Sequence, residues 1–158
     1  MPKSVFDEEI KLMQQWKKAS PHVRREFLEF RRLWKAKGPV EFAHNVLKID
    51  PNTGGPLYVS DDQKEFLLDV SKRGIRLAII IAGRGAGKTF ILAIYIMWRI
   101  FTHENWGISC MGGSREQSDK IHSYIAGWLN NNETLQKFAM KCTLGEIKSY
   151  ANRSASFH

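Results

Sequence analysis

The apolar positions of this 158-residue chain follow two clear helical stripes. The first predicts a helix over residues 21–37, with Ser20 as its N-cap and Pro21 in its first turn. Its apolar face consists of Val23, Phe27, Phe30 and Trp34. The second predicts a helix from residue 114 to residue 129, with a face made of Ile121, Tyr124, Ile125, Trp128 and Leu129. We expect both faces to pack in the core, and we assign the second to packing rather than to a cofactor site.

The rest of the chain alternates helices with short apolar runs. The pattern predicts further helices over residues 5–18, 40–47, 60–73, 88–101 and 133–141. It predicts strands over residues 75–81, 108–111, 142–150 and 153–157. Residues 50–56 form a turn-rich connector. Because strands alternate with helices, we expect an α/β fold in which a parallel sheet carries helices on both faces. The helix over residues 88–101 is apolar nearly all round and should be buried.

One junction between a strand and a helix carries candidate chemistry. Residues 81–90 read IAGRGAGKTF, which has the parts of a phosphate-binding P-loop. Glycines let backbone N–H groups turn toward phosphate oxygens, and the helix N-terminus adds unpaired N–H groups. Lys88 is expected to reach the β- and γ-phosphates, and Thr89 to place its hydroxyl on Mg²⁺. Ala82 departs from the usual spacing, which has glycine there. The alternative interpretation is a glycine-rich turn without a ligand.

Gln63, at the start of a predicted helix, has two interpretations. With Ser60 it forms the S-x-x-Q pattern of a capping box, in which the two residues satisfy each other's backbone N–H groups. It also lies 25 positions before Lys88 and offers both a donor and an acceptor, which are the groups needed to recognise an adenine edge. One glutamine cannot easily serve both roles at once, and spacing alone does not decide between them.

Basic residues outnumber acidic ones, and the excess is concentrated near the N-terminus. The net charge is +8, from 24 basic and 16 acidic residues, and +5 of it lies in residues 1–37. Such an excess favours polyanionic partners such as DNA. The alternative for these helices is an ordinary solvated face. We divide the chain into a basic helical appendage, residues 1–38, and a P-loop domain, residues 39–158.

Neither the cysteines nor the apolar runs indicate secretion or a membrane. Cys110 and Cys142 lack metal-ligand spacing and fit free thiols in a reducing compartment. The N-terminus has no apolar signal core. The longest apolar run, residues 90–98, is far shorter than the about 20 residues that span a bilayer. We expect a soluble, cytoplasmic protein.

The segment GRGAGKT, with arginine after the first glycine, resembles the P-loop of phage terminase large subunits, the ATPases that package viral DNA. Residues 42–63 and 106–125 are also similar to that family, so the resemblance covers about residues 41–158. It implies ATP and Mg²⁺ as cofactors. The residues that it assigns to the nucleotide and its metal are Gln63, Gly83, Arg84, Gly85, Ala86, Gly87, Lys88 and Thr89. By resemblance, Gln63 recognises adenine, while Lys88 and Arg84 are catalytic. Arg84 is expected to sense the γ-phosphate, and its alternative is a solvent-facing loop residue.

The resemblance also implies a function. The chain would be the ATP-binding part of a viral DNA-packaging motor that couples ATP hydrolysis to translocation of double-stranded DNA during virion assembly. Its implied partners are DNA, identical subunits in a ring, and the portal or the small terminase subunit, in the cytoplasm of the host cell. Nuclease activity is expected from a missing C-terminal domain. The alternatives are a helicase-like ATPase stimulated by nucleic acid and a nucleotide-binding module without chemistry of its own.

The sequence offers no clear acidic residue for the metal or the attacking water. In P-loop ATPases an apolar strand ends in such an Asp. Among the carboxylates that follow the loop, Glu116, Asp119 and Glu133 lie in predicted helices or at their starts, and Glu146 lies within a weak strand. We therefore expect an incomplete ATPase domain that binds nucleotide without efficient hydrolysis.

Overall fold

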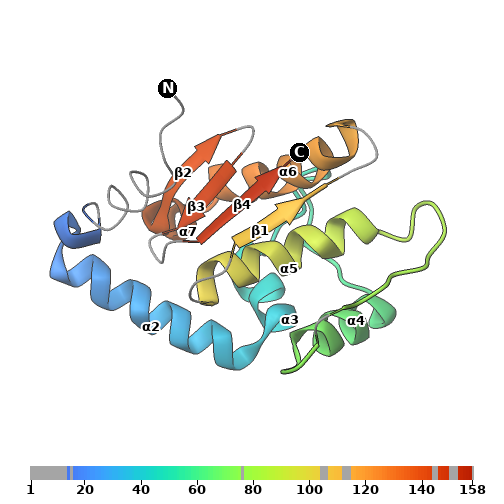
Figure 1. The fold of residues 1–158 in the computed structure, drawn as a ribbon, viewed down its shortest axis with the longest axis horizontal. Helices are drawn as coiled ribbons and strands as arrows, with labels where there is room; N and C mark the ends of the chain where they lie inside the picture. Colours follow the sequence, from blue (N-terminus) through green and yellow to red (C-terminus); the bar gives the residue numbers. More distant parts are fainter. Residues whose placement is uncertain are drawn as a thin grey trace.

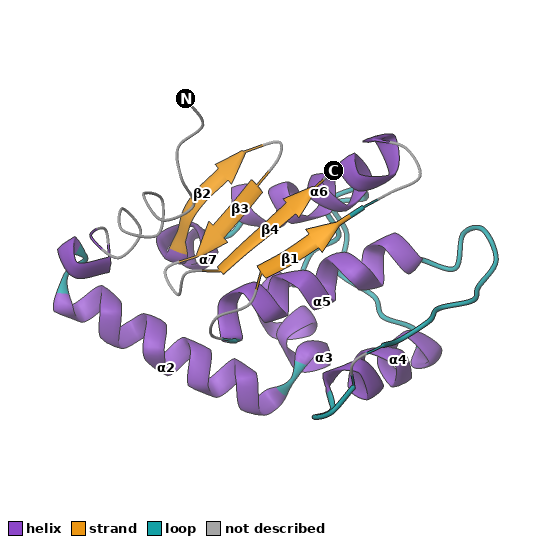
Figure 2. Ribbon diagram, in the orientation of Figure 1, coloured by secondary structure: helices purple, strands orange, loops and turns teal. Residues whose placement is uncertain are grey.

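In the computed structural model the chain is described over residues 14, 16–75, 77–103, 107–111, 115–143, 146–149 and 153–157. The helices are α2 (Pro21–Lys37), α3 (Pro39–Phe42), the π-helix η1 (Ala43–Leu47), α4 (Asp61–Ser71), α5 (Lys88–Thr102), α6 (Arg115–Asn130) and α7 (Glu133–Phe138). The strands are β1 (Gly107–Cys110), β2 (Ala139–Thr143), β3 (Glu146–Ser149) and β4 (Arg153–Phe157). Figures 1 and 2 show these strands as one sheet, with α6 and α7 partly behind it. Helix α5 packs against β4 and β3.

The sheet is mixed, so the prediction of a parallel sheet is wrong. Its strand order is β1-β4-β3-β2. Only β1 and β4 pair in parallel, whereas β3 pairs with both β2 and β4 in antiparallel fashion. The physical reason is connection length, because strands that are a few residues apart form antiparallel hairpins, while a parallel pair needs a long crossover. Here α6 and α7 lie in the crossover between β1 and β4. Helices on both faces of the sheet remain a prediction.

The strand predicted over residues 75–81 is absent from the described part of this segment. Residues 75 and 77–82 are neither helical nor extended in a ladder. The side chains of Leu77, Ile79 and Ile81 are 78%, 75% and 94% exposed. Branched apolar residues fit a pleated, half-buried surface, but a strand also needs a neighbour that supplies its hydrogen bonds. None of the described strands pairs with this segment, so the glycine loop follows an irregular stretch rather than a strand.

Helix α2 forms as predicted and packs onto the body of the molecule. The Ser20 hydroxyl accepts a hydrogen bond from the Val23 backbone N–H at 3.2 Å, which confirms the N-cap. Phe27 is 1% exposed, and its ring meets that of Phe138 on α7 edge to face, with centroids 5.2 Å apart. Such aromatic pairs each contribute about 0.5–1.5 kcal/mol beyond their buried area. The helix therefore shares the main core, although a separate domain over residues 1–38 stays a prediction.

Helix α5 is the centre of the core, as its apolar sequence predicted. Its most deeply buried side chains, each at most 1% exposed, are Ala93, Ile94, Ile96, Met97, Ile100 and Phe101. Replacing a large aliphatic residue in such a position with alanine typically costs about 2–5 kcal/mol. Trp98 donates from its indole to the Trp34 carbonyl of α2 at 2.9 Å, and the Tyr95 hydroxyl donates to the Val70 carbonyl of α4 at 3.4 Å. Helix α5 thus holds the surrounding helices in place around the loop that precedes it.

The connector over residues 50–56 lies against α6. Trp128 donates from its indole to the Ile49 carbonyl at 2.7 Å. A Cβ atom on Gly127 would lie only 2.5 Å from the Pro51 Cβ, so this contact needs a glycine. The close approach places the connector beside the glycine loop, where it contributes Asn52 to the cavity described below.

The prediction of one strand over residues 142–150 is wrong, because this segment contributes to two strands, β2 and β3, that pair with each other. The remaining predicted helices differ mainly at their ends. The short helix predicted over residues 40–47 forms as α3 followed by η1. The helix predicted over residues 133–141 ends at Phe138, because the chain turns there into β2. Of the helix predicted over residues 5–18, residues 14 and 16–18 are helical and the others lie outside the described residues, as does Ser114. None of the described helices combines the length and apolar character needed to cross a bilayer.

Candidate functional site

The glycine loop has a conformation that its glycines make accessible. Gly85 and Gly87 have φ angles of 80° and 75°, in the left-handed region that other residues rarely adopt. Gly87 is also the N-cap of α5, so the first turn of that helix opens directly from the loop. The Lys88 ammonium folds back and donates to the carbonyls of Ala82 at 2.5 Å and Gly83 at 2.8 Å. The lysine therefore closes the loop by joining its end to its beginning.

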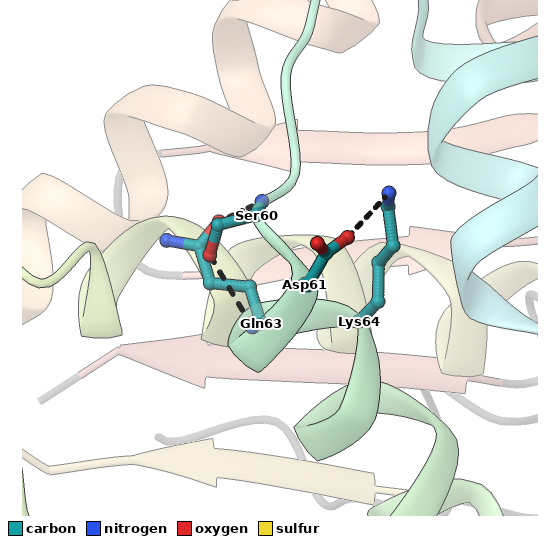
Figure 3. A network of polar contacts seen from close by, with 4 residues as sticks. All are labelled: Ser60, Asp61, Gln63 and Lys64. Atoms are coloured by element: carbon teal, nitrogen blue, oxygen red, sulfur yellow. Dashed lines mark hydrogen bonds and ion pairs between the residues drawn. The ribbon is translucent and has the colours of Figure 1, made fainter.

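Gln63 contacts this loop from α4. Its side-chain oxygen accepts from the Ser60 backbone N–H at 3.0 Å, and the Ser60 hydroxyl accepts from the Gln63 backbone N–H at 3.4 Å, which confirms the capping box (Figure 3). Its amide nitrogen donates to the Ala86 carbonyl at 3.2 Å. A Cβ atom on Gly87 would lie 2.6 Å from that nitrogen, so glycine at this position also makes room for the glutamine. One side chain thus caps α4 and holds the loop.

The other side of the loop borders a cavity of about 1060 Å³. Residues 83–90 form one wall of the cavity. The rest of the lining comes from Asn52 in the connector, from Cys110 at the end of β1, from Met111 just after it, and from several residues of α6. All the loop and helix residues predicted for the nucleotide line this cavity except Gln63, which contacts the loop through Ala86 instead.

Helix α6 supplies a wall that the sequence did not indicate. The side chains in question are Gln117, Lys120, Ile121 and Tyr124. Their spacing places them on one face of the helix. Ile121 and Tyr124 were predicted as core residues; they are half-buried and pack against the core, and they also line the cavity. The Tyr124 ring also packs on Phe90 of α5, with centroids 5.5 Å apart. Only the packing of α6 against α5 brings this face to the loop.

The charged side chains along the cavity are all cationic. They are Arg84, Lys88 and Lys120, and no carboxylate is among the described lining residues. Glu116 and Asp119 are exposed on α6 and do not line the cavity. In the part of the chain that the structure describes, no group of three or more His, Cys, Asp or Glu side chains is arranged for a metal. The described lining of the cavity is therefore suited to an anion.

Cys110, at the end of β1, is a free thiol that is 8% exposed. Burial raises the pKa of this thiol, because the charged thiolate is poorly solvated there. The group therefore stays protonated at neutral pH and serves as an apolar part of the cavity wall rather than as a nucleophile.

Comparisons with known proteins identify a solved structure with a similar fold. No protein-family model matches the sequence. No curated protein matches it either. Among solved structures, the crystal structure of the HK97 bacteriophage large terminase is similar, with a TM-score of 0.68 and 23% sequence identity over 77% of this chain. This chain shares its fold with a phage large terminase. The match confirms at the level of the fold the resemblance that the loop sequence GRGAGKT indicated.

The chain spans only part of the terminase that it matches. The common fold covers 26% of the HK97 terminase chain. The terminase fold therefore accounts for the arrangement of helices and strands around the loop, while the activity and the partners of a whole terminase are matters for proposal.

Proposed function

We propose that this chain is the ATP-binding part of a terminase large subunit, a P-loop ATPase that couples ATP hydrolysis to the translocation of double-stranded DNA. The observation that carries the proposal is Lys88, which closes the glycine loop at the edge of the cavity. The cavity volume of about 1060 Å³ is just above the range of about 300–1,000 Å³ typical of small-molecule sites. The shared terminase fold supports the same assignment.

The polyphosphate of ATP would lie along the loop over residues 83–89. The first N–H groups of α5 have no partner within the helix, and with the helix dipole they attract anions. Lys88 would exchange its two carbonyl partners for β- and γ-phosphate oxygens, and Arg84 would face the γ-phosphate. Thr89 lines the cavity and fits a Mg²⁺ ion, since this metal often takes one or two protein ligands together with phosphate oxygens and water. The bound metal would neutralise charge on the phosphates.

Gln63 has the hydrogen-bonding capacity to recognise adenine in addition to its two structural contacts. A glutamine amide has two acceptor sites on oxygen and two N–H donors. Its contact with the Ser60 backbone uses one acceptor site, and its contact with the Ala86 carbonyl uses one donor. One acceptor site and one donor remain, which is the pair that an adenine edge requires. We therefore propose that capping and adenine recognition are compatible roles of this residue.

The proposed partners follow from charge and from the terminase fold. A net charge of +8 favours association with the DNA backbone. In the whole motor we propose a ring of identical subunits that meets the portal or the small terminase subunit in the cytoplasm of an infected cell. We propose that any nuclease activity of the whole motor belongs to a domain other than this one.

Replacing Lys88 tests the proposal. Lys88→Ala should weaken ATP binding by roughly 10- to 100-fold, because it removes charge-assisted contacts worth about 1.5–3 kcal/mol. A fluorescent ATP analogue is titrated into both proteins, and unlabelled ATP is used as competitor. Lys35→Ala makes the same change on exposed α2, away from the cavity, and should leave the affinity unchanged. Equal affinities of the wild type and Lys88→Ala would refute the assignment.

A further inference from the structure

Helix α6 borders the same cavity as the glycine loop and contributes a lysine to its lining. Gln117, Lys120 and Tyr124, at positions i, i+3 and i+7, form a stripe that lines the cavity, and Ser118 and Ser123 of the same helix also line it. The position of the stripe is fixed by the core, because Ile125 and Trp128 of the same helix are 0% and 2% exposed. The wall therefore belongs to a rigid element and not to a surface loop.

The positive charge of the cavity is not neutralised within it. The Lys88 ammonium is held by two loop carbonyls. Lys120 and Arg84 are exposed and form no ion pair with any residue that the structure describes. Two unpaired cations thus border one cavity from different elements, beside a third that is fixed in the loop. Like charges so arranged repel one another, and a polyanion bound among them removes that repulsion.

We propose that Lys120 is a nucleotide-binding residue that contacts the polyphosphate from the α6 wall of the cavity that the glycine loop also lines. The inference rests on the proposed function, since it takes the ligand of this cavity to be a nucleoside triphosphate. It adds a residue from α6, 32 positions beyond Lys88 in the sequence, to a site otherwise made by the loop and α5. A bound triphosphate then bridges α5 and α6.

The role predicts a dependence on the number of phosphates. A lysine that contacts the polyphosphate contributes most to the binding of ATP, less to that of ADP and least to that of AMP, because its electrostatic attraction grows with the charge of the phosphates. A lysine that only packs along the wall, or that contacts the ribose or base, affects the three nucleotides alike. The ratio of ATP to AMP affinity therefore separates these roles.

The test compares Lys120→Gln with two other variants in competition titrations against a fluorescent ATP analogue, using ATP, ADP and AMP as competitors. We expect Lys120→Gln to lower the affinity for ATP about fivefold, which is the effect of losing one partly exposed charged contact, and to leave the affinity for AMP unchanged. Lys120→Arg keeps the charge and should retain most of the affinity. Lys35→Gln, the same charge change on α2, should have no effect.

The outcomes separate this inference from the proposed function. Suppose that Lys88→Ala loses affinity for ATP, while the ATP affinity of Lys120→Gln stays within twofold of the wild type or its affinities for ATP and AMP fall by the same factor. The inference about Lys120 is then wrong and the proposed function stands. If the wild type shows no preference for ATP over AMP, both fail. Thermal unfolding of each variant confirms that it is folded, and since Lys120 is exposed we expect an unchanged melting temperature.

Discussion

Residues whose partners are close in sequence were the most predictable part of the site. The capping box of Ser60 and Gln63 needs only three residues of separation, and both of its hydrogen bonds form. The contact between Gln63 and the Ala86 carbonyl spans 23 positions, and no local pattern indicates it. Lys120 and Tyr124 were missed for the same reason, because a residue's place in the cavity depends on how two helices pack.

Gln63→Ala should narrow the preference for ATP over GTP while leaving most triphosphate binding intact, because the variant lacks the amide that we propose for adenine recognition but keeps Lys88 and the loop glycines. Ser60→Ala is the matched control. It removes one capping hydrogen bond, with a cost of about 1 kcal/mol in stability, and leaves the amide in place. Competition by ATP and GTP is measured for both variants, together with thermal unfolding. If both variants lose stability alike and neither changes its preference, Gln63 acts only as a cap.

At the scale of elements, helices were predicted better than strands. The helix over residues 21–37 was found within its predicted bounds, because its cap and its apolar stripe are local signals. Residues 75–81 have the composition of a strand, yet Leu77, Ile79 and Ile81 are largely exposed. A helix supplies its own backbone hydrogen bonds, whereas a strand depends on a neighbour elsewhere in the sequence. The prediction of a parallel sheet was wrong because the short connections between β2, β3 and β4 favour antiparallel pairing.

The contact between α2 and α7 should make stability depend on pH. Lys137 of α7 forms an ion pair with Glu26 of α2. The hydrogen bond from this lysine lowers the pKa of the Glu26 carboxyl below its ordinary value, with a further contribution from the lysine's charge. A lowered pKa in the folded state means that the stabilisation is present above the ordinary carboxyl pKa of about 4.3 and is lost as the pH falls through the folded value.

Melting temperatures of the wild type and Glu26→Gln should therefore differ at pH 7 and converge on acidification below about pH 4. Lys137→Gln breaks the same pair from the other side and should behave in the same way. A difference between the wild type and Glu26→Gln that persists unchanged to pH 3 would show that the pair does not contribute through its charge.

At the scale of the whole molecule, the cavity is built from segments that are far apart in sequence. The connector, the glycine loop, the end of β1 and α6 all border it, and the packing of α6 on α5 brings them together. The sequence predicted the chemistry of the loop from a motif, but it gave no measure of the cavity around it.

Because the sequence offers no clear acidic residue for the metal, we predict slow phosphate release by the purified chain. A P-loop ATPase needs an Asp near Mg²⁺ and a group that positions the attacking water. We expect turnover well below about 1 s⁻¹, a modest rate for an enzyme, with or without double-stranded DNA. Sustained release at or above that rate, lost in Lys88→Ala, would show that an acid of this chain reaches the site.

The central claim is that the loop over residues 83–89 holds the phosphates of ATP, and amide hydrogen exchange tests it most directly. Exchange is followed by mass spectrometry for the wild type alone, with ATP and Mg²⁺, and with adenosine and Mg²⁺. Phosphate oxygens that accept hydrogen bonds from loop N–H groups should slow their exchange. We predict protection of peptides that contain residues 83–90 by ATP, none by adenosine, and clearly less protection by ATP in Lys88→Ala at a concentration near the wild-type Kd. Unchanged exchange of this segment in a wild-type protein saturated with ATP would contradict the account.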